Sequence, residues 1–131
     1  MKKLLATLFT LSAVSVAVAK EVNFKFLGTS DVHGRIVPWS YGADVEDKSG
    51  SYAQIATYVK EARKAHPDLI LVDIGDAIQD NQVEVFAKTE KYYKDNPVPK
   101  VLNAMGYDIF ILGNHEFNFG MTALDEILKD I

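Results

Sequence analysis

The stretch "LILVDIGD", residues 69 to 76, is a short apolar run that ends in glycine and aspartate. Apolar runs of this length are typical of strands that are covered on both faces of a parallel sheet. The runs "VNFKFLG" (22–28) and "YDIFILG" (107–113) also end at a glycine, and stretches with helical periodicity separate the three runs. This alternation predicts an α/β domain with a mostly parallel sheet flanked by helices.

The expected helices have recognisable ends. The first should run from Ser51, which forms a capping box with Gln54, to a stop before Pro67. Three further helices are expected to begin near Asn81 (with Glu84 as its capping partner), Pro99 and Thr122. Residues 29–50 are rich in Gly, Ser, Asp and Pro, and they predict a long functional loop in which Trp39 and Tyr41 could contact a ligand.

The N-terminal residues 1–19 predict a secretory signal peptide. Two lysines precede an apolar run that ends in Ala17, Val18 and Ala19, the small-residue pattern at which signal peptides are cleaved. We therefore expect a mature chain that starts at Lys20 and is exported to the periplasm or the extracellular space, without a stable membrane anchor. The sequence stops within an apparent amphipathic helix, "LDEILKDI" (124–131), so we expect residues 20–131 to be the N-terminal part of a domain that a missing C-terminal portion completes.

Charge and cysteine content exclude several classes of function. The 14 Lys and Arg include Lys2 and Lys3, so 12 basic residues remain after residue 19 against 18 acidic ones, a net charge of −6. Such a chain repels nucleic-acid polymers, which need basic surfaces, although a small phosphorylated substrate held by metal is compatible with it. The absence of cysteine excludes disulfides and cysteine zinc sites.

Polar clusters follow each predicted strand: "SDVHG" (30–34), "GDAIQDN" (75–81) and "GNHE" (113–116). The carboxyl ends of parallel strands open at one edge of a sheet, so the three clusters should form one site. Asp31 and His33 stand two residues apart and would point the same way on an extended segment, where they could bind one metal ion. Asp76 could bridge two ions. Taken singly, Asp31 could instead cap a turn, His33 could be an ordinary surface histidine, and Asp76 could be a helix N-cap.

The third cluster places three different groups side by side. Asn114 offers a neutral oxygen ligand. His115 could bind metal or face the substrate as a proton donor or as a stabiliser of negative charge. Glu116 would orient its neighbours. Two other acids have less prominent expected roles: Asp73 as a buried hydrogen-bonding partner and Asp80 as a turn or cap residue.

In this order, "DVHG", "GD" and "GNHE" resemble the first three motifs of the calcineurin-like metallophosphoesterases. The longer stretch "NAMGYDIFILGNHEFNFG" (103–120) is similar to the bacterial exported nucleotidases, which include 5'-nucleotidases and 2',3'-cyclic-nucleotide 2'-phosphodiesterase/3'-nucleotidases. The resemblance implies hydrolysis of a nucleotide phosphoester by metal-activated hydroxide, with two divalent ions (Mn, Zn, Fe or Co) as cofactors. It also implies the roles of five residues: Asp31 and His33 bind one ion, Asp76 bridges both, Asn114 binds the other, and His115 is catalytic.

Two departures from the family pattern refine this expectation. Position 118 is Asn, as in the cyclic-phosphodiesterase branch, whereas 5'-nucleotidase-like members have Asp there. This favours the cyclic-nucleotide branch and leaves 5'-nucleotidase as the alternative. The family also completes its metal sites with later histidines, so residues 20–131 alone should bind metal weakly and show little activity.

Two functions of other classes fit the sequence less well. A secreted cation-binding module would use acidic loops for Ca²⁺, but such a module does not need His33 or His115. A glycoside hydrolase would need an acid and nucleophile pair of carboxylates, which no loop offers.

Overall fold

The computed structural model describes residues 21–131, so the expected signal peptide lies outside the described residues. Three strands, β1 (Phe26–Thr29), β4 (Ile70–Asp73) and β5 (Ile109–Phe110), form a parallel sheet in the order β1-β4-β5. Phe26 pairs with Ile70, and Val72 pairs with Ile109. The predicted α/β class and parallel sheet are confirmed. No helix within residues 21–131 is both long and apolar enough to cross a bilayer.

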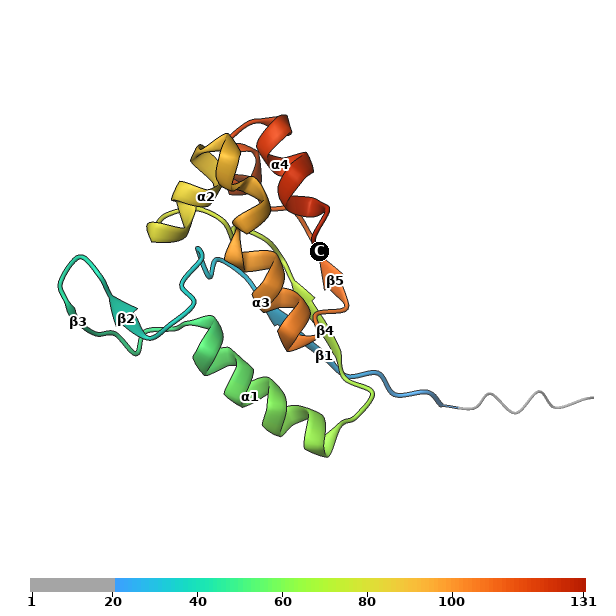
Figure 1. Ribbon diagram of the computed structural model, residues 1–131. Helices are drawn as coiled ribbons and strands as arrows, with labels where there is room; N and C mark the ends of the chain where they lie inside the picture. Colours follow the sequence, from blue (N-terminus) through green and yellow to red (C-terminus); the bar gives the residue numbers. More distant parts are fainter. Residues whose placement is uncertain (1–20) are drawn as a thin grey trace, which may run out of the picture.

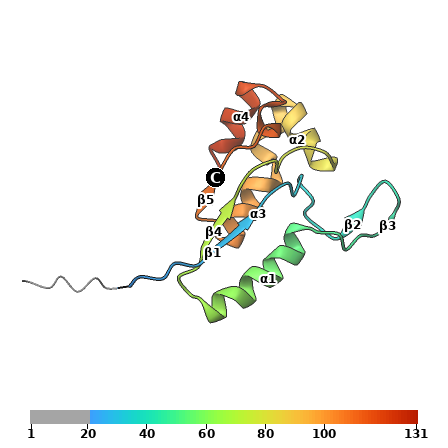
Figure 2. The same cartoon turned by 180° about the vertical axis from the view of Figure 1, so that it is seen from behind.

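Helices α1 (Tyr52–Ala65) and α3 (Pro97–Met105) make the two crossovers and lie on the same face of the sheet (Figures 1 and 2). Arg63 of α1 donates hydrogen bonds to the carbonyls of Met105 and Gly106 at the end of α3. Figure 2 shows the opposite face of the sheet, which no helix of residues 21–131 covers. Several large apolar side chains in the strands and beside them are exposed: Phe24, Phe26, Ile74, Ile109 and Ile111.

The predicted start of α1 is confirmed, because Ser51 Oγ accepts the backbone N–H of Gln54 at 3.4 Å. α3 begins at Pro97, two residues before the expected start, since Asn96 Oδ1 caps it by accepting the N–H of Val98 at 3.0 Å. The last helix, α4 (Met121–Leu128), lies where the sequence predicts it.

The helix expected from Asn81 is wrong as a single element. The chain forms three short pieces instead: η1 (Gln82–Glu84), α2 (Val85–Lys88) and η2 (Glu90–Asp95). Asn81 does cap the first piece, with its Oδ1 accepting the N–H of Val83 at 3.0 Å. Thr89 has an extended backbone, which ends α2 after a single turn.

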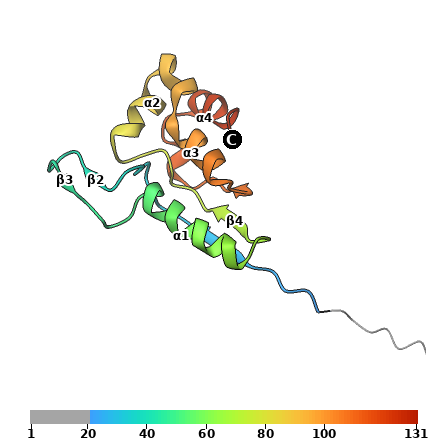
Figure 3. The ribbon, with the colours of Figure 1, turned by 60° about the horizontal axis from the view of Figure 1, so that its bottom comes forward.

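The long loop after β1 contains a small antiparallel hairpin that the sequence did not predict, β2 (Trp39–Ser40) and β3 (Val45–Glu46). It projects from the rest of the structure, beyond the start of α1 (Figure 3). The strand expected over 22–27 also begins later, at Phe26, because its partner β4 starts only at Ile70, whose N–H bonds to the carbonyl of Lys25.

The main hydrophobic core lies at the carboxyl end of the sheet. Its buried members come from α1, α3, α4 and the segment after β4: Tyr52, Ala77, Ile78, Val83, Ala87, Val98, Leu102 and Ile127. The polar loops that leave the strands therefore rest directly on packed side chains.

Candidate active site

The loops after β1 and β4 stay paired beyond the ends of the strands. The N–H of Asp31 bonds to the carbonyl of Gly75 at 3.0 Å, and the N–H of His33 bonds to the carbonyl of Asp76 at 2.9 Å. Asp31, His33 and Asp76 have φ values of 56°, 51° and 57°. Residues other than glycine rarely adopt this left-handed conformation, which clusters at functional sites. The chain therefore turns at both Asp31 and His33, so the extended segment on which the two side chains would point the same way does not form.

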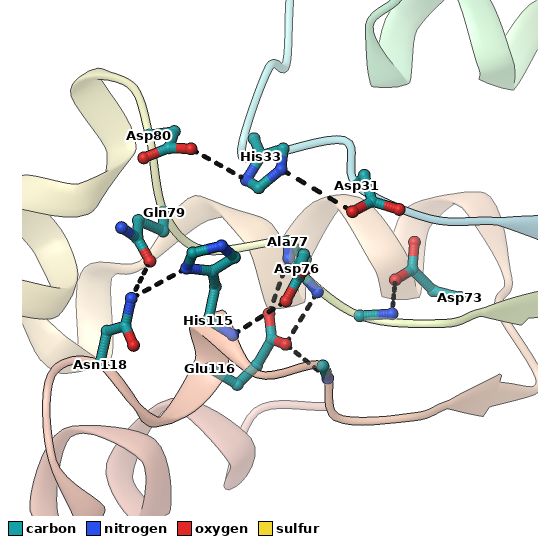
Figure 4. A network of polar contacts seen from close by, with 12 residues as sticks. Asp31, His33, Asp73, Asp76, Ala77, Gln79, Asp80, His115, Glu116 and Asn118 are labelled. Atoms are coloured by element: carbon teal, nitrogen blue, oxygen red, sulfur yellow. Dashed lines mark hydrogen bonds and ion pairs between the residues drawn. The ribbon is translucent and has the colours of Figure 1, made fainter.

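Despite this turn, the structure brings together three of the predicted metal ligands. Asp31, His33 and Asp76 each offer a ligand atom, and these atoms all lie within 4.8 Å of one another. His33 Nε2 is 4.0 Å from Asp31 Oδ1 (Figure 4). Because metal–ligand bonds of about 2.1 Å allow two ligands of one ion to be at most about 4.2 Å apart, a bound ion would draw these three side chains closer together. The three residues fit a divalent cation.

Asp80 is a site residue that the sequence reasoning missed. Its Oδ2 lies 3.5 Å from Nδ1 of His33, on the side of the ring away from Asp31 (Figure 4). Nδ1 of His33 is buried, and no group in the described part of the chain forms a hydrogen bond with it. A carboxylate facing the second nitrogen of a metal-binding imidazole fixes its orientation and raises its basicity. Only its position in "GDAIQDN", four residues after Asp76, could have pointed to this role.

The third polar cluster includes η3 (His115–Phe117) and lies beside the first two clusters. The N–H of His115 bonds to Asp76 Oδ1 at 2.9 Å, and its ring centroid lies 5.5 Å from that of His33. Nδ1 of His115 is 2.9 Å from Nδ2 of Asn118. Asn114 lies immediately before η3 with an exposed side chain, next to the His115 N–H that contacts Asp76. Its role as a ligand stays a prediction.

Glu116 holds the second and third loops together. Only 1% of its surface is exposed, and its carboxylate accepts the N–H groups of Asp76 (2.8 Å), Ala77 (2.7 Å) and Gly113 (2.7 Å). A buried carboxylate needs such partners to offset its lost hydration. Glu116 therefore orients its neighbours through their backbones.

Two glycines allow these loops to approach each other. A Cβ at Gly113 would overlap with Asp76, lying 2.7 Å from its backbone nitrogen, and a Cβ at Gly75 would lie 2.7 Å from the carbonyl oxygen of Ile111. Gly75 also has a φ of +92°, which disfavours other residues. The glycines of "GD" and "GNHE" are thus required by the contact between the two loops.

Asp73 lies below the site at the end of β4, and its predicted role as a buried hydrogen-bonding partner is confirmed. It accepts hydrogen bonds from Thr29 Oγ1 (2.7 Å), Tyr52 OH (3.5 Å) and the N–H of Gly75 (2.9 Å). Burial raises the pKa of Asp73 above its ordinary value, against the opposing effect of these hydrogen bonds.

Trp39 and Tyr41 line a cavity of about 450 Å³ next to the metal-ligand group. Arg35, Phe86 and Asp80 also line it, and Asp80 connects it to His33. The two aromatic residues thus share a cavity with Asp80, and their contact with a ligand stays a prediction.

Comparison with known proteins agrees with this geometry. The family model for calcineurin-like phosphoesterases matches residues 24–129. The trifunctional nucleotide phosphoesterase YfkN of Bacillus subtilis is 36% identical over 86% of this chain and 8% of its own length. The 2',3'-cyclic-nucleotide 2'-phosphodiesterase/3'-nucleotidase of Haemophilus influenzae is 34% identical over 94% of this chain and 20% of its own length. Bovine 5'-nucleotidase is 34% identical over 95% of this chain and 21% of its own length.

The crystal structure of YfkN superimposes with a TM-score of 0.75 and 33% identity, covering 82% of this chain and 34% of that one. The chain spans between 8% and 21% of the length of the curated relatives named above. Calcineurin-like phosphoesterases are hydrolases of phosphoric ester bonds that use divalent metals. From the family match and the Asp31, His33 and Asp76 group together, we conclude that this chain belongs to the calcineurin-like phosphoesterase family.

Proposed function

We propose that this chain carries part of the active site of an exported enzyme that hydrolyses nucleotide phosphoesters, as a 2',3'-cyclic-nucleotide 2'-phosphodiesterase/3'-nucleotidase. The observation that carries the proposal is the convergence of Asp31, His33 and Asp76, with the ring of His115 beside them. The alternative within the family is a 5'-nucleotidase, since relatives of both names match the chain.

The proposed cofactors are two divalent ions. Asp31 and His33 would hold the first, Asp76 would bridge both, and Asn114 would contribute to the second. Mixed carboxylate, imidazole and amide ligands suit Mn²⁺, Zn²⁺, Fe or Co²⁺ better than an ion that prefers oxygen alone. When bound, such ions neutralise phosphate charge and lower the pKa of a coordinated water.

Three side chains have proposed roles besides binding the metal: Asp76, His115 and Asp80. Asp76 accepts the N–H of His115 at 2.9 Å, so the same carboxylate that offers a metal ligand also positions the histidine. His115 would contact a phosphate oxygen and stabilise the charge that develops on it. Asp80 would keep the ring of His33 directed at the metal through the 3.5 Å contact with Nδ1.

Asn118 supports the cyclic-nucleotide branch. Its neutral amide lies against His115, 2.9 Å from Nδ1. A carboxylate at that position would stabilise a positively charged imidazole, which an amide does not do. The residue at position 118 therefore affects whether His115 can act on the substrate as a positively charged proton donor.

The proposed location rests on residues 1–19 alone. Their pattern predicts cleavage before Lys20 and export to the periplasm or the extracellular space. N-terminal sequencing of the protein recovered outside the cytoplasm tests this proposal, and a chain that still starts at Met1 would contradict it.

Hydrolysis assays on the full-length protein test the activity. We expect hydrolysis of 2',3'-cyclic AMP to 3'-AMP, and of 3'-AMP to adenosine and phosphate, in preference to hydrolysis of 5'-AMP. We also expect loss of activity in a chelator and recovery with Mn²⁺ or Zn²⁺. Asp76→Asn should abolish turnover, whereas Asp68→Asn, at an exposed turn away from the site, should not. Preference for 5'-AMP would favour the 5'-nucleotidase alternative, and turnover that survives Asp76→Asn would exclude the proposed site.

A further inference from the structure

The cavity beside the metal-ligand group has three aromatic side chains in its lining. Trp39 and Tyr41 come from the β2–β3 hairpin, and Phe86 comes from α2. The hairpin and α2 lie at the same end of the structure (Figures 1 and 2). Trp39 is 40% exposed and Tyr41 is 59% exposed, so both keep surface that a ligand can cover. Aromatic faces of this kind bind planar rings by stacking.

The side chain of Arg35 holds the base of the hairpin in place. Its guanidinium donates hydrogen bonds to the hydroxyl of Ser49 and to the carbonyl of Gly50 (3.4 Å), and it lies 3.6 Å from Oδ2 of Asp47. The N–H of Asp47 bonds to the carbonyl of Pro38 at 3.0 Å. These contacts join the segments before and after the hairpin. The aromatic side chains that the hairpin carries are thereby pre-organised, which lowers the cost of binding a ligand.

The segment after β4 connects the cavity to the metal-ligand group. Nδ2 of Asn81 donates a hydrogen bond to the carbonyl of His33, and its Oδ1 accepts the N–H of Val83 at 3.0 Å. Asp80 also lines the cavity, and its Oδ2 lies 3.5 Å from Nδ1 of His33. A ligand in the cavity would therefore lie next to the side chains that are candidates to bind the metal.

The charges of the cavity lining do not suit a phosphate group. One cation, Arg35, and two anions, Asp47 and Asp80, give the lining a net charge of −1, and Arg35 is paired with Asp47. A phosphate group binds best where cationic side chains can donate hydrogen bonds to it. Gln82 adds an exposed amide, which can both donate and accept hydrogen bonds. The lining therefore suits a neutral, planar group with hydrogen-bonding edges.

We propose that this cavity binds a nucleobase, stacked against Trp39 and Tyr41 with its polar edge toward Gln82. The volume of about 450 Å³ is in the range of sites for small organic ligands. The choice of a base follows from the cavity, whereas its part in catalysis rests on the proposed function. Two sources can supply the base: the nucleotide whose phosphate lies at the metal-ligand group, or a second nucleoside across a phosphodiester bond.

The fluorescence of Trp39 reports directly on this cavity, since Trp39 is the only tryptophan in the 131 residues. We suggest titrating the full-length protein with adenosine, which has a base and no phosphate, and with ribose as the control ligand. The difference in emission between wild-type protein and Trp39→Phe isolates the signal of Trp39 from any tryptophan beyond residue 131. We expect adenosine to quench this signal in a saturable way, and ribose to leave it unchanged.

Substitutions around Trp39 test whether the lining binds the base. Tyr41→Ala should weaken adenosine binding by at least about tenfold through lost stacking, and Gln82→Leu by about threefold through lost hydrogen bonds. Tyr58→Ala, at an exposed tyrosine of α1 outside the cavity, is the matched control and should leave the dissociation constant unchanged. The proposal is overturned by Trp39 emission that does not respond to adenosine, or by equal affinities in Tyr41→Ala and Tyr58→Ala.

Kinetics of Trp39→Ala in the full-length protein distinguish the two sources of the base. If the base belongs to the hydrolysed nucleotide, KM for 2',3'-cyclic AMP should rise at least about fivefold with kcat nearly unchanged. If it belongs to a second nucleoside, only KM for the dinucleotide adenylyl-(3',5')-adenosine should rise. Unchanged KM for both would overturn the part of the cavity in substrate binding. Protein that hydrolyses neither compound, but whose Trp39 emission responds to adenosine, would contradict the proposed function and support the base site.

Discussion

The carboxylate of Glu116 accepts the backbone N–H of Asp76 at 2.8 Å. A residue of the third polar cluster thereby holds the backbone of a candidate metal ligand in the second. The same carboxylate accepts the N–H groups of Ala77 and Gly113, so three donors from two loops meet on one buried side chain.

Loss of Glu116 should therefore destabilise the fold strongly. Glu116→Ala leaves three backbone donors without their acceptor, and we expect the free energy of unfolding to fall by about 3–5 kcal/mol. Urea denaturation measures this change. Glu61→Ala is the control, since Glu61 is exposed and its ion pair within residues 21–131 is with Lys64 alone, so it should cost less than about 0.5 kcal/mol. Equal losses in the two variants would contradict this assignment.

Gly113→Ala should disturb the site through sterics alone. The added Cβ would lie 2.7 Å from the backbone nitrogen of Asp76 and 2.9 Å from its Cγ. We expect a loss of about 1–3 kcal/mol in unfolding free energy, together with weaker Mn²⁺ binding because Asp76 must move. The control is Gly42→Ala, in the hairpin, where a Cβ meets nothing within 4 Å. Unchanged Mn²⁺ affinity in Gly113→Ala would argue against Asp76 as a ligand.

Metal affinity should depend on Asp76 more than on Asp80. Asp76→Asn keeps an oxygen to accept the His115 N–H but removes the charge, so we expect Mn²⁺ binding to weaken by at least about a hundredfold in calorimetric titrations. Asp80→Asn should weaken it by about tenfold, since Asp80 acts through the ring of His33. An effect of Asp80→Asn as large as that of Asp76→Asn would mean that Asp80 itself binds the ion.

The stability of the protein should depend on pH through Asp73. Burial raises the pKa of Asp73 above 3.8, so the folded state binds its proton more tightly than the unfolded state. The contribution to stability is fully present below pH 3.8 and is lost as the pH rises through the raised pKa. Asp73→Asn should remove this slope from a series of urea midpoints, and an unchanged slope would contradict the assignment.

Asp47 should affect the pH dependence of stability in the opposite direction to Asp73. Hydrogen bonds from Ser49 lower the pKa of Asp47 below 3.8. Its contribution is present above the unfolded pKa and is lost as the pH falls through the folded one. Asp47→Asn should therefore reduce the loss of stability in acid and leave the slope that Asp73 causes unchanged. Loss of the Asp73 slope in this variant would mean that the two carboxylates do not act independently.

Local signals in the sequence predicted most elements of the fold. The apolar run at 69–74 contains β4, and Ser51 caps α1, because both depend on neighbouring residues. The helix expected from Asn81 failed because the segment divides into three short pieces against the core, with Val83 and Ala87 buried in it. The β2–β3 hairpin was missed because each strand has only two residues.

The sequence by itself determined the chemistry of the site: which acids, amides and imidazoles follow each strand, and that parallel strands bring them to one edge. Only the tertiary structure decided their geometry. Asp31, His33 and Asp76 take left-handed backbones because their loops pair with each other. Asp80, Gln79 and Glu116 find partners on another loop, 39 to 47 positions away. Such contacts depend on how distant segments pack, and no local pattern encodes them.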